Sequence, residues 1–202
     1  MHQPITITHP ALLLGEGVEE QRLFSAFLRH LEREDSVQIL PYEGKNNLRS
    51  FLKALPAVPG FARLRSLAIT RDADTDFAAA ASSVTDAIAA AAAGIPGHIR
   101  ISTFILPGPG RTGALEDLCL DAIRDLPAWE CAKALATCVN HQRQQQGAGA
   151  APSPAEEAKR QLRAWLCTLP QPGIRLGDAA LAGHLPMNAP AFAALREFLA
   201  AI

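Results

Sequence analysis

The sequence predicts an α/β protein in which a mostly parallel central sheet is flanked by helices. Short apolar runs alternate with longer stretches of helical periodicity, which makes four strand–helix units within about 125 residues. The apolar runs lack alternating polar residues, as expected of strands that are buried on both faces. Parallel strands joined through helices by right-handed crossovers satisfy both observations.

The first unit begins with Ala11–Leu14, an apolar run that predicts a buried strand. It leads directly into Gly15-Glu16-Gly17. Glycine on both sides of Glu16 allows a tight turn and leaves the carboxylate uncrowded. In Val18–Glu32 the apolar residues then recur at helical spacing, so we expect a helix there.

The second unit pairs a strand at Val37–Leu40 with a helix at about Asn47–Leu55. Lys45, Arg49 and Lys53 recur every four residues and therefore lie along one face of this helix. Such a stripe is typical of a solvated helix face. It also suits contact with nucleic-acid phosphates beside an acidic cluster.

The third strand leads into the predicted functional site. Leu67–Thr70 is apolar and partly β-branched, and Asp72, Asp74 and Asp76 follow at alternate positions. If the strand continues through Asp74, the first two carboxylates project to the same side. Carboxylates held that close repel one another unless a cation lies between them, and oxygen donors suit Mg²⁺ or Mn²⁺. The alternative is a polar turn in which an aspartate caps the next helix, Phe77–Ala93.

The fourth unit is a strand at Ile99–Leu106 followed by a helix that opens at Gly113–Leu118. Glu116 and Asp117 in the first turn of that helix either favour its N-terminus or support the metal site. Functional groups in parallel sheets collect at the carboxyl ends of the strands. We therefore expect Glu16 and the first two aspartates of the third unit to converge at one sheet edge.

The C-terminal part is predicted to be helical, with helices at Ala128–Gln146, Ala155–Leu166 and Pro190–Ile202. A low-complexity loop separates the first two helices. We therefore divide the chain into an α/β domain over residues 1–126 and a helical C-terminal extension over residues 127–202, packed on that domain.

Composition narrows the function classes. A net charge of −1 argues against a surface that binds nucleic acid throughout, so such contact must come from a local patch or a partner. The four cysteines form no CxxC pair, and we expect small buried thiols in a reducing cytoplasm. We see no secretion signal and no apolar run of the roughly 18 residues that a membrane span needs. We therefore expect a cytoplasmic protein with no membrane contact.

Two short motifs, Gly15-Glu16-Gly17 and Asp72-Ala73-Asp74, together resemble the Toprim fold shared by topoisomerases, DnaG-type primases and OLD-family nucleases. More closely, EGKNNLRSFLKAL, ITRDADTD and ILPGPGRTGALEDL are similar to the Toprim-like proteins grouped as DUF3226, near the DUF4435 proteins. The similarity covers nearly the whole chain.

The resemblance implies that Glu16 is the general acid or base, or a metal ligand, and that Asp72 and Asp74 hold Mg²⁺ or Mn²⁺. Asp76 would be a further ligand. Such a site neutralises charge at a phosphodiester and stabilises the entering and leaving oxygens. Our leading hypothesis is a Mg²⁺-dependent phosphotransfer protein, a nuclease acting on DNA or RNA. The one tyrosine, Tyr42, does not stand at an obvious topoisomerase position, which argues against topoisomerase activity.

Two other function classes stay open. The protein could be a non-catalytic interaction module, since related Toprim-like proteins often accompany ABC- or AAA-type ATPases in phage defence. It could also act on a small phosphorylated substrate, and a homo-oligomer is compatible with either class. A wide basic groove would favour nucleic acid, a narrow closed pocket a small substrate, and an apolar patch over the C-terminal helices a partner subunit.

Overall fold

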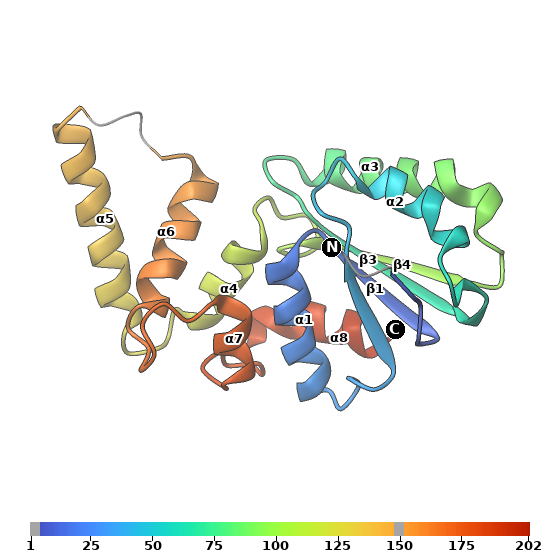
Figure 1. Cartoon of the computed structure of the whole chain (residues 1–202). Helices are drawn as coiled ribbons and strands as arrows, with labels where there is room; N and C mark the ends of the chain where they lie inside the picture. Colours follow the sequence, from blue (N-terminus) through green and yellow to red (C-terminus); the bar gives the residue numbers. More distant parts are fainter. Residues whose placement is uncertain (1–4, 148–151) are drawn as a thin grey trace.

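The centre of the computed structural model, which describes residues 5–147 and 152–202, is a four-stranded sheet (Figure 1). Its strand order is β2-β1-β3-β4, and every neighbouring pair is parallel. The strands are β1 (Ala11–Gly15), β2 (Val37–Pro41), β3 (Ser66–Asp72) and β4 (Arg100–Leu106). The predicted fold class, a layered α/β protein with a parallel central sheet, is confirmed.

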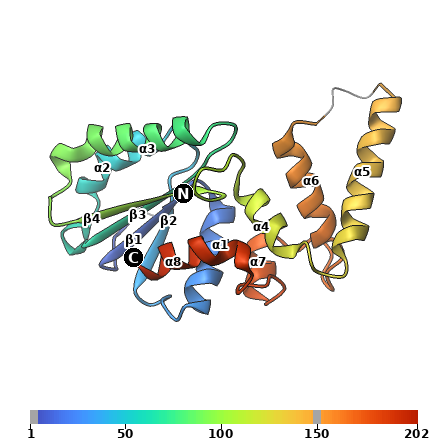
Figure 2. The same ribbon diagram turned by 180° about the vertical axis from the view of Figure 1, so that it is seen from behind.

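Helices cover both faces of this sheet. The helices of the described residues are α1 (Val18–His30), α2 (Leu48–Ala54), α3 (Phe77–Ala91), α4 (Leu115–Ile123), α5 (Trp129–Gln145), α6 (Pro154–Leu166), α7 (Leu176–Leu181) and α8 (Ala193–Ala200), of which α5 and α6 lie outside these layers (Figure 1). Helices α2 and α3 lie on one face, and α1 and α8 lie on the other (Figures 1 and 2). The predicted strands and long helices are all present, whereas α7 was not predicted. The last predicted helix begins as a 3₁₀ turn, Pro190–Phe192, before α8.

Two hydrophobic cores form because successive strand residues point to opposite faces of the sheet. Leu13 of β1 joins the core beneath α1 and α4, whereas Leu12 and Leu14 join the core beneath α2 and α3. All three side chains are fully buried. The central strands therefore carry the apolar runs that the sequence shows.

The C-terminal helices complete the layer on the α1 face. The ring of Phe192 meets that of Phe27 edge to face, with centroids 4.9 Å apart, and Phe198 lies 5.3 Å from Phe104 of β4. One core therefore runs across the predicted boundary at residue 126, and the division into two domains stays a prediction. Helices α5 and α6 project from the layers as a hairpin (Figure 1).

One segment is, by length and composition, long and apolar enough to cross a membrane. Phe77–Gly94, which comprises α3 and the turn after it, has 18 residues and a mean hydropathy of 1.3, and 22% of this segment is buried. This finding corrects the expectation that no stretch of the chain is long and apolar enough. The helix packs Ala80, Val84 and Ala87 into the sheet core.

The expectation of four buried cysteines is correct only for Cys119. Cys131, Cys138 and Cys167 are exposed. The first two lie on α5, which buries a different stripe, including Ala132 and Ala136. Because α5 packs only this one side, thiols on its other sides face solvent.

Gly177 explains how α7 packs so closely on α1. A Cβ at Gly177 would lie 2.1 Å from Cβ of Arg22 and 2.9 Å from its carbonyl carbon. Gly177→Ala should therefore push α7 off α1 and lower the free energy of unfolding by about 1–3 kcal/mol, the usual range for overpacking. Urea denaturation measures this change. Gly97→Ala is the matched control, since a Cβ there meets nothing within 4 Å, and equal stability of the two variants would contradict the packing.

Candidate functional site

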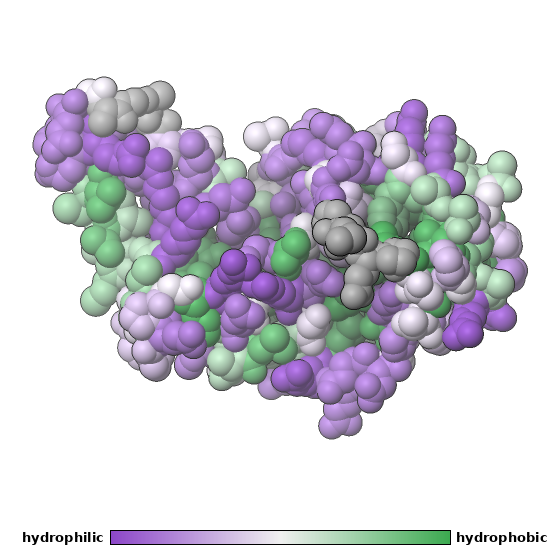
Figure 3. Space-filling view, viewed as in Figure 1, coloured by the Kyte–Doolittle hydropathy of each residue, from purple (hydrophilic) through white to green (hydrophobic). Residues whose placement is uncertain are grey.

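A cleft of about 1030 Å³ separates the carboxyl edge of the sheet from the α5–α6 hairpin. Figure 3 shows the surface hollowed between the hairpin and the α/β layers. Carboxylates line it from the sheet side, namely Glu16, Glu19, Glu20, Glu43, Asp72 and Glu116. Basic side chains line it from α6 and the segment before α7, namely Lys159, Arg163 and Arg175. The cleft therefore has an acidic wall and a basic wall.

Glu16 is held at the cleft by the backbone around it. The carbonyl of Gly15 accepts a hydrogen bond from Tyr42 N at 3.0 Å, and the carbonyl of Glu16 accepts one from Gly44 N at 2.9 Å. These bonds extend the β1–β2 pairing past the ends of both strands. The half-buried side chain of Glu16 is thereby positioned at the cleft, where the sequence predicted it.

Glu20 is the site residue that sequence reasoning missed. A glutamate in the first turn of a helix commonly serves only to complement the helix dipole, yet Glu20 of α1 is only 9% exposed. Burial raises the pKa of Glu20, and the charges of Glu16 and Glu116 add to the effect. The available signal was its nearness to Glu16 along the chain, since only the turn at Gly17, the N-cap of α1, and the start of the helix separate the two glutamates.

Asp72 ends β3 and faces the same cleft. Its Oδ1 accepts a hydrogen bond from Leu115 N at 3.0 Å, at the start of α4. Burial, together with the charges of Glu20, Glu16 and Glu116, raises the pKa of Asp72 to about 8, although the Leu115 hydrogen bond opposes the shift. The four carboxylates Glu16, Glu20, Asp72 and Glu116, which come from different elements, therefore interact electrostatically with one another.

Asp74 turns away from this group. The strand ends at Asp72, and Asp74 has a left-handed φ of 53° and forms an isolated antiparallel bridge with Gly113. Its carboxylate lies 2.6 Å from Nζ of Lys45 and does not line the cleft. The condition for Asp72 and Asp74 to project to one side, a strand that continues through Asp74, is therefore not met.

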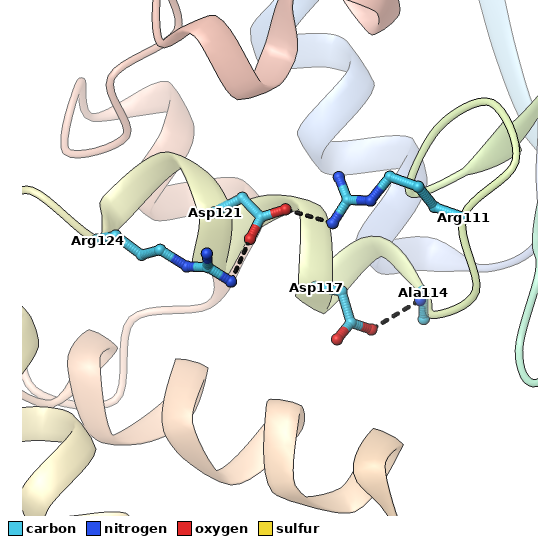
Figure 4. A network of polar contacts seen from close by, with 5 residues as sticks. All are labelled: Arg111, Ala114, Asp117, Asp121 and Arg124. Carbon is cyan, nitrogen blue, oxygen red and sulfur yellow. Dashed lines mark hydrogen bonds and ion pairs between the residues drawn. The ribbon is translucent and has the colours of Figure 1, made fainter.

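Asp76 and Asp117 have helix-capping contacts. Asp76 is the N-cap of α3, and its side chain accepts a hydrogen bond from Ala79 N at 2.9 Å. Asp117 accepts one from Ala114 N at 2.8 Å at the start of α4 (Figure 4). Neither residue lines the cleft. These contacts match the capping alternatives that the sequence left open.

Glu116 lines the cleft at the start of α4, and its Oε1 lies 3.9 Å from Nζ of Lys159 on the opposite wall. On another side of α4, Asp121 pairs with Arg111 and Arg124 (Figure 4). That pairing ties the loop before α4 to the helix. It thereby supports the turn that presents Leu115 N to Asp72.

The predicted basic stripe, Lys45, Arg49 and Lys53, does not line the cleft. Lys45 precedes α2 and pairs with Asp74, while Arg49 and Lys53 are exposed on α2. Helix α2 packs on the core opposite the one that contains residues of α6. The role of Lys45, Arg49 and Lys53 in nucleic-acid binding stays a prediction.

The acidic wall has the donors that a magnesium ion prefers, but they are not gathered around one point. Within residues 5–147 and 152–202, no three histidine, cysteine or carboxylate side chains converge closely enough to hold a metal ion. Burial is the main cause of the raised pKa values of Glu20 and Asp72, and the neighbouring carboxylates nevertheless lie near enough to add to them by repulsion. The donor chemistry fits a divalent cation, and the long glutamate side chains would have to rotate inward to bind it.

Comparisons with known proteins give one match. A family model described as "Protein of unknown function (DUF3226)" matches residues 10–202. Searches of the curated proteins and of the solved structures found no match. The matched range includes every residue of the acidic and basic walls.

The raised pKa of Asp72 predicts a pH-dependent stability. An unfolded aspartate titrates near its ordinary pKa of about 3.9, so between there and about pH 8 the folded state binds more protons. The contribution of Asp72 to the free energy of unfolding therefore falls as pH rises through this window. In Asp72→Asn this contribution is absent, so the stability of the variant relative to wild type should increase from about pH 5 to about pH 8 and then level off.

Urea denaturation across this pH range measures the difference. Asp86→Asn removes an exposed carboxylate of α3, outside the cleft, and its difference from wild type should not vary in this way. A pH-independent effect of Asp72→Asn would show that Asp72 titrates as an ordinary aspartate.

Proposed function

The chain belongs to the DUF3226 family, and we propose that it is a Mg²⁺- or Mn²⁺-dependent, Toprim-like phosphotransfer protein that acts as a nuclease on DNA or RNA. One observation carries the proposal. Glu16, Glu20, Asp72 and Glu116, from the end of β1, from α1, from the end of β3 and from α4, line one cleft at the carboxyl edge of a parallel sheet. Ligand and catalytic sites of open α/β sheets lie at this edge.

Asp72 is the central ligand in this proposal. Leu115 N holds Oδ1, which leaves Oδ2 free to bind a cation. Because burial and neighbouring charges keep its pKa near 8, cation binding at neutral pH would displace a proton from Asp72. We therefore expect tighter cation binding as pH rises from about 6 to about 8.

Glu16 is suited to handle protons in this site. It is half-buried beside the cleft, and its backbone is held by the end of β2. A divalent cation, when bound, supplies charge neutralisation at the phosphate and lowers the pKa of water. Glu16 would then accept a proton from the attacking water at its carboxylate oxygen, while Glu20 and Glu116 complete the oxygen donor set.

The order of acids along the strands supports the Toprim-like type, with Glu16 after β1 and Asp72 at the end of β3. Asp74 departs from that pattern because it pairs with Lys45 outside the cleft. Both partners are almost half exposed, and ion pairs of this kind contribute only about 0–1 kcal/mol. Asp74 could therefore leave Lys45 at little cost when a cation binds.

A second function, that of a subunit in an ATPase-containing complex of the phage-defence type, is favoured by a different observation. On α5, Leu135 is 55% exposed and Val139 is 45% exposed. They project from a hairpin that stands apart from the α/β layers (Figure 1). Apolar side chains on a projecting helix suit a protein partner. In this reading the acidic cleft would bind a cation or basic residues of the partner without catalysis.

Cation binding can be tested by thermal melts without any substrate. A ligand that binds only the folded state stabilises it by about 2.7 kcal/mol at 100 times its Kd, which corresponds to a Tm rise of roughly 5–11 °C for a domain of this size. We expect this rise for wild type and Asp86→Asn in saturating Mg²⁺ or Mn²⁺. Asp72→Asn and Glu20→Gln should lose most of it, because each variant removes a charged oxygen donor.

Hydrolysis is tested with labelled DNA and RNA strands. We expect cleavage that requires Mg²⁺ or Mn²⁺, is abolished by a chelator and falls at least 100-fold in Asp72→Asn, the scale of losing one group that stabilises transition-state charge. Asp86→Asn should cleave as wild type does. If Mg²⁺ and Mn²⁺ leave the Tm unchanged and neither the protein nor its complex cleaves either strand, the interaction-module function is the better one.

A further inference from the structure

The basic wall of the cleft is built on one face of α6. Lys159 and Arg163 lie four residues apart and line the cleft together with Leu162 and Leu166, and the i, i+3, i+4, i+7 spacing of these residues defines one helix face. Arg175, directly before α7, adds a third cation from a different segment. Two elements that are distant in sequence from the acidic strand ends thus present positive charge to the acidic wall of the cleft.

These cations are available to a ligand. Arg163 and Arg175 are exposed, and neither guanidinium forms an ion pair within the part of the chain that the structure describes. Lys159 is 3.9 Å from Glu116, at the outer limit of an ion pair. Guanidinium groups bind phosphate through paired hydrogen bonds, which makes Arg163 and Arg175 suitable contacts for a phosphodiester.

We infer that Lys159, Arg163 and Arg175 bind the phosphate backbone of a single-stranded nucleic acid that lies in the cleft. The inference rests on the proposed function, because a strand whose scissile phosphate is at the acidic wall must place neighbouring phosphates elsewhere in the cleft. The opposite wall carries the positive charge that those phosphates need. The α5–α6 hairpin is then a substrate-binding arm.

The size and lining of the cleft indicate which nucleic acid fits. Its volume of about 1030 Å³ slightly exceeds the roughly 300–1,000 Å³ typical of pockets for small ligands, which suits a short single-stranded segment better than a duplex. The lining contains no aromatic side chain among the described residues, so bases have no stacking platform. The strand is therefore held through its phosphates, with little preference for sequence.

The charges of the two walls predict how binding depends on cations. The lining has six carboxylates, Glu16, Glu19, Glu20, Glu43, Asp72 and Glu116, against three basic side chains. The acids outnumber the bases even when Asp72 and Glu20 are protonated, so without a bound cation the cleft repels a polyanion. A divalent cation at the acidic wall reduces this repulsion. Binding should therefore be stronger with Ca²⁺ present than without it, whereas contacts made by the stripe of Lys45, Arg49 and Lys53, which does not line the cleft, would not need a cation at the acidic wall.

Two triple variants with the same change of charge test the inference. Lys159→Gln, Arg163→Gln and Arg175→Gln remove the basic wall, and Lys45→Gln, Arg49→Gln and Lys53→Gln remove the stripe around α2. Binding of a fluorescently labelled single-stranded oligonucleotide in Ca²⁺ is followed by anisotropy at several salt concentrations. Each single-strand phosphate contact contributes about 0.7 to the slope of log K against log salt, so the first variant should lose about 2 and the second almost nothing.

The outcomes are distinct. A slope and affinity unchanged in the basic-wall variant, an equal loss in both variants, tighter binding of the matching duplex, or no binding by wild type would each overturn the inference. If the basic-wall variant binds as wild type does while Mg²⁺-dependent cleavage persists, this inference fails and the proposed function stands. If binding depends on the basic wall but no cleavage occurs in Mg²⁺ or Mn²⁺, the proposed hydrolysis fails and the binding wall stands.

Discussion

The parallel pairing of β1 with β3 is the constraint on which the cleft depends. Leu14 stands opposite Ile69 in the register, so the acids that follow these strands leave the sheet at the same edge. A buried hydrogen bond from Thr70 Oγ1 to the carbonyl of Leu14, 2.9 Å long, fixes this register at the end of the strands. A shift by one residue would move Asp72 to the opposite face of the sheet.

The same edge is joined to β2 by Tyr42. This buried tyrosine donates a hydrogen bond from its hydroxyl to the carbonyl of Thr70 at 2.9 Å, across the end of β1. The backbone of Tyr42 also donates to Gly15 O. Tyr42 therefore has a structural role beneath the cleft.

The fold tolerates a cluster of like charges because two apolar cores stabilise the elements that carry it. Burial and mutual repulsion disfavour the ionised forms of Glu20 and Asp72, and such groups concentrate at functional sites. Opposite charge is nearby but does not neutralise the cluster, since Lys159 lies 3.9 Å from Glu116 and Lys45 is bound to Asp74. The remaining charge imbalance is what makes the cleft suited to a cation and an anionic ligand together.

Local sequence determined the strands, the long helices and the acids at the strand ends, because apolar periodicity and turn residues act over a few positions. It could not reveal that Asp74 leaves the strand direction, since that depends on its bridge to Gly113, a residue of a later loop. Local sequence also could not reveal the burial of Glu20, because solvent exposure depends on neighbours distant in the chain. Only the tertiary structure placed the basic face of α6 opposite the acids at the sheet edge, because this position depends on the apolar packing of α6 against α4.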